Sequence, residues 1–347
     1  MHQSTPSPAA RSRVGLILAL TSALAFGGSG VVAKPLIEAG LAPLHVTWLR
    51  AAGAAVLLLP LAWRYRRLVW ERPGLLAGFG LFAVAGVQAC YFAAISRIPV
   101  GVALLIEYLG PALLLGWVRF VQRRPVSRAA GVGVVLAVTG LAFVVEIWAG
   151  LGFDAIGILL ALGAAFCQVG YFVLADHGSA GGEGKPPAEP AGVIAYGLLF
   201  GALLLTVVAR PWGMDWSVLG GSASMDGREV PALLLLGWIV LVATVAAYLT
   251  GVLAVRRLSP QVAGVIACLE AVVATVLAWV VLAEHLGAAQ VVGGTLVLAG
   301  ALIAQRSAPR PAAGEPVAAG PGPLPAPTEE GPLPASTGDL PTAARRP

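Results

Sequence analysis

Two glutamates stand inside apolar runs where a purely apolar segment has no need of a carboxylate. Glu107 lies in IEYLGPALLLGWV (106–118), four residues before Pro111, and Glu270 lies in ACLEA (267–271). Placing a charged side chain at the centre of a membrane-spanning helix costs about 2.5–3.5 kcal/mol, and carboxyl groups that are kept there serve proton relays and substrate pathways. We therefore predict that both glutamates bind protons or substrate. The alternative is that each is hydrogen-bonded to a neighbouring helix and serves packing only.

Two basic residues accompany the acids. Arg50 stands in HVTWLRAAGAAVLLLP (45–60), and Lys34 is followed directly by Pro35. Arg50 could balance the charge of Glu107 or orient a substrate carboxylate, because a planar guanidinium holds a carboxylate through two parallel hydrogen bonds. The alternative for both basic residues is that the side chain extends to the membrane interface. Both interpretations of Arg50 stay open, and the interface is favoured for Lys34.

Three further pairs of polar and aromatic residues could line a cavity. They are Gln88 and Tyr91, Gln168 and Tyr171, and Thr244 and Tyr248. The first two pairs have i,i+3 spacing, so each pair shares one face of a helix. Such residues also form hydrogen bonds between membrane helices, and the sequence leaves both roles open.

The composition places these residues in a membrane protein. The chain has 347 residues, of which 58% are hydrophobic and only 11% are charged, whereas soluble domains carry about 25% charged residues. The pI of about 9.4 could suggest nucleic-acid binding. However, the basic residues form short clusters between apolar runs, without a basic face or an aromatic RNA-binding motif. The sequence therefore predicts a lipid-bilayer environment and no nucleic-acid partner.

Signatures of enzymes and of metal sites are missing from the sequence. It contains no HExxH, GxSxG or Walker motif, which are common marks of catalytic sites. The four histidines are scattered over the N-terminal arm, span ends and loops, and the three cysteines lack the spacing of metal ligands. We predict no catalysis, no metal and no cofactor. Besides a transporter, a receptor or scaffold without transport and a passive channel remain as alternatives.

Apolar runs long enough to cross a membrane recur along the chain. A span needs about 20 mostly apolar residues, and most breaks between the runs carry Pro, Gly or charged residues. We predict an all-α membrane protein with ten transmembrane helices. The predicted spans are 14–34, 44–63, 74–95, 99–119, 129–147, 155–175, 191–209, 231–254, 260–282 and 287–305.

The distribution of Lys and Arg predicts the orientation. With the N-terminus inside, most basic residues between spans fall on the cytoplasmic side, and the other side holds only Arg97, Arg210 and Arg228. Cytoplasmic loops carry the excess of positive charge. We therefore predict an inner (cytoplasmic) membrane protein with both termini in the cytoplasm.

The two ends of the chain are predicted to lie outside the bilayer. Residues 1–13 form a cytoplasmic N-terminal arm, and residues 306–347 form a tail rich in Pro, Ala and Gly. Such a tail cannot bury enough apolar surface to offset its ordering entropy. We expect it to be disordered.

The chain repeats itself at an offset of 160 residues. The aligned pairs include Arg97 with Arg257, Gly133 with Gly293, and Gly140 with Gly300. Residues 14–147 and 155–305 are then two five-helix repeats, and an odd number of spans inverts the second in the membrane. Inverted repeats are typical of secondary transporters, whose sites lie near the midplane at the repeat interface. The offset aligns Glu107 three residues before Glu270, on a similar helix face.

The sequence resembles the ten-helix EamA-type transporters of the drug/metabolite transporter superfamily over about residues 14–305. SRIPVGVALLIEYLGP (96–111) resembles the branch that contains bacterial threonine/homoserine exporters, and ACLEA (267–271) resembles its Ser-Leu-Glu-Pro signature. The chain departs from that signature at Ala271, which replaces a Pro that would break the helix. The resemblance implies a secondary transporter of small polar metabolites that exports amino acids or related compounds, with proton coupling as one option.

Overall fold

The structure is a computed structural model that describes residues 8–123, 125, 127–146, 153–179, 188–225, 227–255 and 260–307. The predicted C-terminal tail lies outside the described residues, apart from its first two. The described residues belong to one compact unit.

The described part of the chain is built from helices whose positions follow the apolar runs. Two of them, η1 and η5, are π-helical, and two short ones, η3 and η4, are 3₁₀-helical. The first half contains α1 (Pro8–Glu38), α2 (Pro43–Leu57), α3 (Leu59–Arg64), α4 (Arg67–Glu71), α5 (Pro73–Phe79), η1 (Gly80–Gly86), α6 (Val87–Ile95), α7 (Val100–Glu107), α8 (Gly110–Phe120) and α9 (Arg128–Val144). The second half contains α10 (Ala155–Ser179), α11 (Pro190–Ala209), η3 (Pro211–Gly213), η4 (Trp216–Gly220), α12 (Ala232–Val240), η5 (Leu241–Ala246), α13 (Ala247–Val255), α14 (Pro260–Leu282) and α15 (Ala288–Ser307).

Several of these helices are suited to a bilayer. Among the described residues, five helical segments are long and apolar enough to cross a membrane, and they are Val14–Glu38, Pro73–Ile95, Val100–Phe120, Pro190–Ala209 and Ala232–Gly251. Shorter apolar helices cover Arg128–Val144, Ala155–Tyr171, Leu269–Leu282 and Ala288–Ile303.

Prolines divide two of the predicted spans. The span predicted at 44–63 separates into α2 and α3 next to Pro60, and the span predicted at 99–119 separates into α7 and α8 next to Pro111. A proline has no N–H to donate to the carbonyl four residues earlier, and its ring presses against that carbonyl. In contrast, α14 runs without a break through Ala271, where the absence of proline leaves the hydrogen-bond ladder complete.

Two spans contain π-helical segments in their middle. η1 joins α5 to α6, and η5 joins α12 to α13. Within η5 the hydroxyl of Thr244 donates a 2.8 Å hydrogen bond to the carbonyl of Ile239, five residues earlier. Such wide turns are rare and often occur at functional sites, which directs attention to the residues around Thr244.

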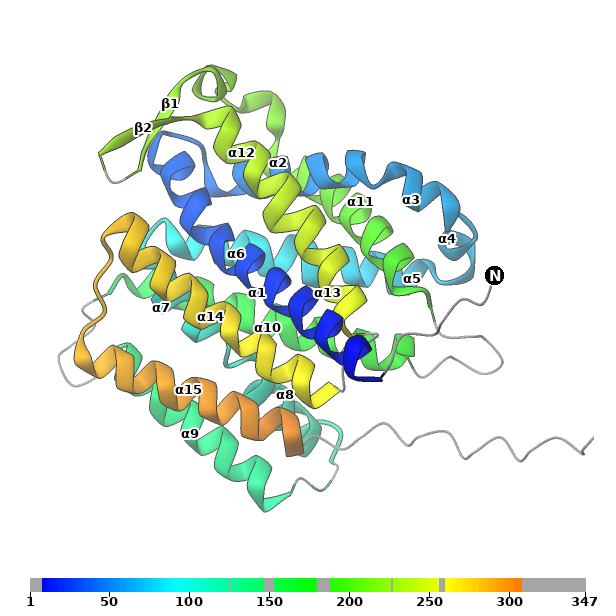
Figure 1. The fold of residues 1–347 in the computed structure, drawn as a ribbon, viewed down its shortest axis with the longest axis vertical. Helices are drawn as coiled ribbons and strands as arrows, with labels where there is room; N and C mark the ends of the chain where they lie inside the picture. Colours follow the sequence, from blue (N-terminus) through cyan, green and yellow to red (C-terminus); the bar gives the residue numbers. More distant parts are fainter. Residues whose placement is uncertain are drawn as a thin grey trace, which may run out of the picture. The chain divides into compact units, whose positions relative to one another are not determined.

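Glycines allow the closest helix contacts. α9 and α15 lie side by side along one edge of the bundle (Figure 1). A Cβ atom at Gly140 would lie 2.6 Å from the carbonyl oxygen of Gly293, and one at Gly300 would lie 2.5 Å from the carbonyl oxygen of Gly133. The two backbones therefore touch at positions that no larger residue could occupy. Figure 1 also shows α1 running beside α14 and α13.

One connection contains a small β-hairpin. β1 (Ser222–Met225) and β2 (Arg228–Pro231) pair antiparallel between η4 and α12, and Gly227 in their turn has φ of 73°. Asp-Gly is a strong signal for such a turn. The all-α prediction overlooked this hairpin, because an eight-residue ladder between two spans has no membrane-scale apolar pattern.

The start of α10 is fixed by Asp154. Its carboxylate accepts a 2.9 Å hydrogen bond from the N–H of Gly157 and lies 3.1 Å from the guanidinium of Arg97. The hydrogen bond from Gly157, followed by the contact with Arg97, holds the pKa of Asp154 below its ordinary value. The negative charge is thus retained at the helix N-terminus, where it interacts favourably with the helix dipole.

Candidate functional site

Arg50 lies at the centre of the candidate site. It belongs to α2, and only 3% of its surface is exposed. Its side chain does not reach outward, so the interface interpretation does not hold for this residue. The guanidinium lies 5.6 Å from the ring centre of Phe92, a cation–π distance.

Four hydrogen bonds hold the guanidinium. Nε donates to the hydroxyl of Thr244 at 2.7 Å, and Nη1 donates to Ser29 Oγ and to Gln88 Oε1, each at 2.7 Å. Nη2 donates to the carbonyl of Ala243 at 3.2 Å. These acceptors come from α1, α6 and η5 and are all neutral. A guanidinium has five N–H groups, so one donor on Nη2 has no partner among the residues that the structure describes.

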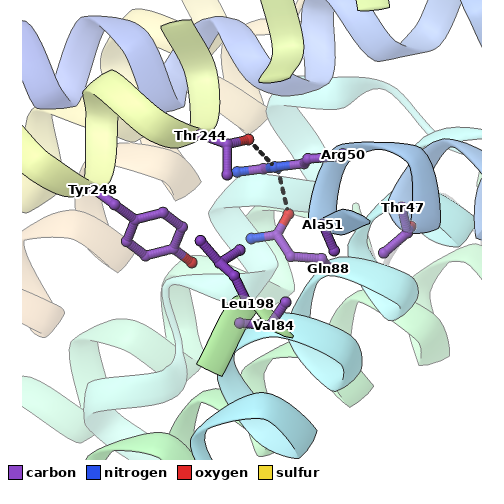
Figure 2. Close-up of a pocket in the computed structure, with 8 residues that line it drawn as sticks. All are labelled: Thr47, Arg50, Ala51, Val84, Gln88, Leu198, Thr244 and Tyr248. Atoms are coloured by element: carbon purple, nitrogen blue, oxygen red, sulfur yellow. Dashed lines mark hydrogen bonds between the residues drawn. The ribbon is translucent and has the colours of Figure 1, made fainter. Parts of the chain in front are cut away.

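A small cavity lies beside Arg50. It has a volume of about 10 Å³ and is lined by Thr47, Arg50, Ala51, Val84, Gln88, Leu198, Thr244 and Tyr248. Figure 2 shows Arg50 between Thr244 and Gln88, with the ring of Tyr248 extending toward the same space from the other side. This volume is about that of one water position. The polar lining residues must therefore separate before a metabolite can enter.

A larger groove elsewhere has a different character. It has a volume of about 350 Å³ and is lined by apolar residues of α8, α9 and α10, among them Trp117, Phe120 and Phe166. Binding sites for polar molecules need convergent polar groups to fix orientation, and the lining of this groove provides no polar side chain other than the tryptophan. The cavity beside Arg50 is therefore the better candidate.

Glu107 is the last residue of α7. Pro111 explains this position, because it cannot donate an N–H to the Glu107 carbonyl four residues earlier. The side chain of Glu107 is only 8% exposed. Within the described part of the chain its carboxylate takes part in no hydrogen bond or ion pair. No fully enclosed side-chain oxygen among the described residues lacks a partner, so the carboxylate of this largely buried acid keeps some exposure at the helix break.

Glu270 lies on α14 near the same break. Its carboxylate accepts a hydrogen bond from the hydroxyl of Tyr108 at 3.4 Å, and Tyr108 directly follows Glu107. The two glutamates interact electrostatically with each other and with Arg50. No direct ion pair joins Arg50 to either of them among the described residues. The cluster therefore holds one cation and two acids, and no ion pair joins the cation to either acid in the described part of the chain.

The other predicted residues divide between the cavity and its surroundings. Gln88 and Tyr248 line the cavity. Tyr91 is buried beside Phe92, and its hydroxyl lies against Gly30. Tyr91 is thus buried, whereas Gln88 and Tyr248 are half-buried.

The remaining predicted pair lies on α10, outside the cavity lining. Gln168 places its amide against Gly110 at the start of α8, and Tyr171 packs edge-on against Phe79, with ring centres 5.4 Å apart. These two residues thus contact neighbouring helices, which is the packing alternative that the sequence left open.

Lys34 does not extend to the interface as favoured from the sequence. Its ammonium group forms an ion pair with the carboxylate of Glu284, in the connection between α14 and α15. The second oxygen of Glu284 accepts a 2.9 Å hydrogen bond from the N–H of Val100, the first residue of α7. The preceding residue, Ala283, has φ of 52°, a conformation that non-glycine residues rarely adopt. One carboxylate thus joins α1, α7 and the α14–α15 connection.

The sequence analysis missed several partners in the site. Ser29, Phe92 and Glu284 make direct contacts with the predicted cations. Tyr108 donates to Glu270, and Thr47 lines the cavity. Only Glu284 carried a usable signal, because the charged AEHLG segment interrupts two apolar runs. A single Ser or Phe inside an apolar run gives no indication of its partner.

The fold and the polar cluster between its helices define a class of protein. The sequence matches the EamA-like transporter family over residues 13–146 and 155–305, and the chain belongs to this family of membrane transporters.

Particular relatives are threonine/homoserine exporters. The chain is 28% identical to the threonine/homoserine exporter RhtA of Escherichia coli (strain K12) over 292 residues, which cover 83% of this chain and 88% of the exporter. It is 30% identical to RhtA of Salmonella typhimurium (strain SL1344) over 291 residues, covering 82% and 90%. A solved structure titled "Crystal structure of protein" matches with a TM-score of 0.56 and 19% identity, over 86% of this chain and 97% of the other. That match supports the fold alone.

Proposed function

We propose that this protein is a secondary transporter of the cytoplasmic membrane that exports amino acids or related small polar metabolites. The names of the exporters that it resembles support the substrate class. Proton coupling through Glu107 and Glu270 is part of the proposal, because intramembrane carboxyl groups serve as proton relays in transporters.

The observation that carries the proposal is the buried charge of Arg50. Its guanidinium has only neutral hydrogen-bond partners among the described residues, and it lies beside a cavity that is lined in part by polar side chains. A buried charge is costly unless a counter-charge offsets it. Arginine is also well suited to bind a planar carboxylate. A substrate carboxylate would satisfy both conditions.

Ten spans arranged as two inverted repeats, 14–147 and 155–305, complete the proposal. Three features at the 160-residue offset support it. The π-helical segments η1 and η5 begin 161 residues apart and end 160 apart, and Arg123 and Ala283 both have positive φ, at 55° and 52°. The Gly140–Gly293 contact has its counterpart in the Gly300–Gly133 contact at the same offset. Such a two-fold relation is expected when alternating access moves one repeat against the other.

The orientation belongs to the same proposal. The excess of Lys and Arg in alternate connections favours both termini in the cytoplasm, since positively charged loops are retained there. Export would then carry substrate from the side of the termini to the side of the β-hairpin.

The first experiment is amino-acid counterflow in proteoliposomes. The wild type should exchange labelled for unlabelled amino acid, and Arg50→Met should reduce exchange at least tenfold while the protein still inserts. Arg97→Gln is the matched control, because this exposed arginine belongs to a surface ion pair of little energetic weight. If no substrate exchanges in the wild type, the protein is a receptor, scaffold or channel instead of a carrier.

The second experiment addresses proton coupling. The double variant Glu107→Gln, Glu270→Gln removes both charges with little change of shape. At every pH from 5.5 to 8, transport driven by a pH gradient should be much slower in the double variant than in the wild type, since neither side chain can then carry a proton. Wild-type rates in a correctly folded double variant would refute proton transfer through these residues.

A further inference from the structure

The break between α7 and α8 gathers hydrogen-bond acceptors. Because Pro111 lacks an N–H, the helical hydrogen bond to the Glu107 carbonyl cannot form. The carbonyl end of a helix also carries partial negative charge. α7 ends at Glu107 itself, so that a helix C-terminus and a carboxylate occupy the same position within the predicted span.

The carboxylate of Glu107 has an unusual environment. Glu107 is only 8% exposed, and no described residue donates a hydrogen bond to its carboxylate, which is not among the fully enclosed atoms. The charged groups that interact with it are Glu270, which repels it, and Arg50, which is held by other partners. A largely buried carboxylate in such surroundings is stabilised by a cationic partner or by a proton.

The charges of Arg50 and of the two glutamates are opposite in sign to the two ends of an amino acid. Arg50 lines the cavity and has one N–H without a partner in the described part of the chain. Glu107 and Glu270 interact with Arg50 electrostatically but form no ion pair with it among these residues. An α-amino acid carries its ammonium and carboxylate groups on one carbon atom. A molecule of that size could join the two charged sides when the lining side chains separate.

We propose that the C-terminal end of α7, with the carboxylates of Glu107 and Glu270, binds the α-ammonium group of the substrate, while Arg50 binds its carboxylate. This inference rests on the proposed function and narrows it to zwitterions with free amino and carboxyl groups. The protein would thus recognise both the ammonium and the carboxylate group of the substrate, and the remaining cavity wall would contact the side chain of the substrate.

The test compares binding of three probes to the purified full-length protein by isothermal titration calorimetry. The probes are L-threonine, L-threoninamide, which lacks the carboxylate, and 2,3-dihydroxybutanoate, in which a hydroxyl replaces the amino group. The wild type should bind threonine at least tenfold more tightly than either analogue. Hydrogen bonds to charged groups contribute about 1.5–3 kcal/mol, and tenfold corresponds to about 1.4 kcal/mol.

Two variants assign the poles. Glu107→Gln should reduce the preference for threonine over dihydroxybutanoate about tenfold and leave the preference over threoninamide unchanged. Arg50→Lys should reduce the preference for threonine over threoninamide and leave the preference over dihydroxybutanoate unchanged, since lysine keeps the charge but not the planar pair of donors. Glu229→Gln makes the same chemical change as Glu107→Gln on the exposed hairpin and should behave as the wild type.

Three outcomes would overturn the inference. An unchanged preference over dihydroxybutanoate in Glu107→Gln would place the ammonium group elsewhere and leave the transporter proposal intact. A second outcome is that threonine binding needs sodium in the wild type but not in Glu107→Gln, while the preference for threonine over dihydroxybutanoate stays unchanged. The carboxylates of Glu107 and Glu270 would then bind a metal cation instead of the ammonium group. If wild-type protein neither binds threonine nor exchanges amino acids in proteoliposomes, the proposed function fails together with the inference.

Discussion

Replacing Lys34 with methionine should destabilise the protein, because it removes the partner of a largely buried carboxylate. Methionine keeps much of the length and apolar surface of lysine but carries no charge. In the structure the Lys34 and Glu284 side chains are only 19% and 13% exposed. Loss of the ion pair would affect α1, α7 and the α14–α15 connection, since Glu284 also accepts the N–H of Val100 at the start of α7.

The magnitude follows from this burial. An exposed ion pair contributes about 0–1 kcal/mol, and breaking a fully buried pair costs about 3–5 kcal/mol. After allowance for the remaining solvent screening, we expect each of Lys34→Met and Glu284→Gln to cost about 2 kcal/mol. The double variant should cost less than the two together, with a coupling energy of about 1–2 kcal/mol.

The assay is a double-mutant cycle on the free energy of unfolding in mixed micelles. Glutamine can still accept the Val100 N–H, so the cycle isolates the charge interaction from the helix cap. Additivity of the two single variants within about 0.5 kcal/mol would refute the reasoning. It would mean that the ion pair adds nothing to the stability of this arrangement of α1, α7 and the α14–α15 connection.

Three further predictions concern packing, orientation and the tail. Gly140→Ala should cost about 1–3 kcal/mol of unfolding free energy, because the new methyl group would collide with the backbone of α15, whereas Gly116→Ala, which meets nothing within 4 Å, should be neutral or stabilising. In a background without the native cysteines, a membrane-impermeant maleimide added from outside should label Gly220→Cys but not Trp70→Cys, although the Trp70 side chain is 87% exposed; labelling of Trp70→Cys would reverse the proposed orientation. A chain ending at Ser307 should express and transport as the full chain does, because the Pro-rich tail contributes little apolar burial, and loss of transport at normal expression would show that the tail has a role.

The helix positions could be predicted from the sequence because hydropathy is a local property. α14 has the predicted bounds, 260–282, and α11 differs from its predicted span by one residue. The break at Glu107 was also readable, since Pro111 is four residues away and the effect of proline on that carbonyl is general. The prediction of an unbroken span from 99 to 119 gave the apolar run more weight than the proline.

The partners in the site could not be predicted, because they depend on how distant segments pack. Arg50 contacts Thr244, 194 residues away, and Lys34 contacts Glu284, 250 residues away. From their depth along a helix, the side chains of Arg50 and Lys34 could lie in the interior or extend to the membrane interface. Which of the two occurs depends on how the helices pack. Shared helix faces were predicted for Gln168 and Tyr171, but a shared face does not reveal which neighbour it meets.

The π-helical segments determine how many residues their spans must contain. Each wide turn accommodates one residue more than an α-helix would, and one residue corresponds to a rotation of about 100° around the helix axis. If one residue after Thr244 were deleted from η5, the turn could close as a regular α-helix, and Tyr248 on α13 would keep its direction toward the cavity, because the wide turn already absorbs that residue. The same deletion in the regular helix α12 would instead rotate the start of the span by about 100° relative to Thr244 and Tyr248. Both shortened spans would be as apolar as before and would still insert. Deletions in η5 and in α12 are therefore expected to differ in their effect on transport, which substitutions that conserve hydropathy would not reveal.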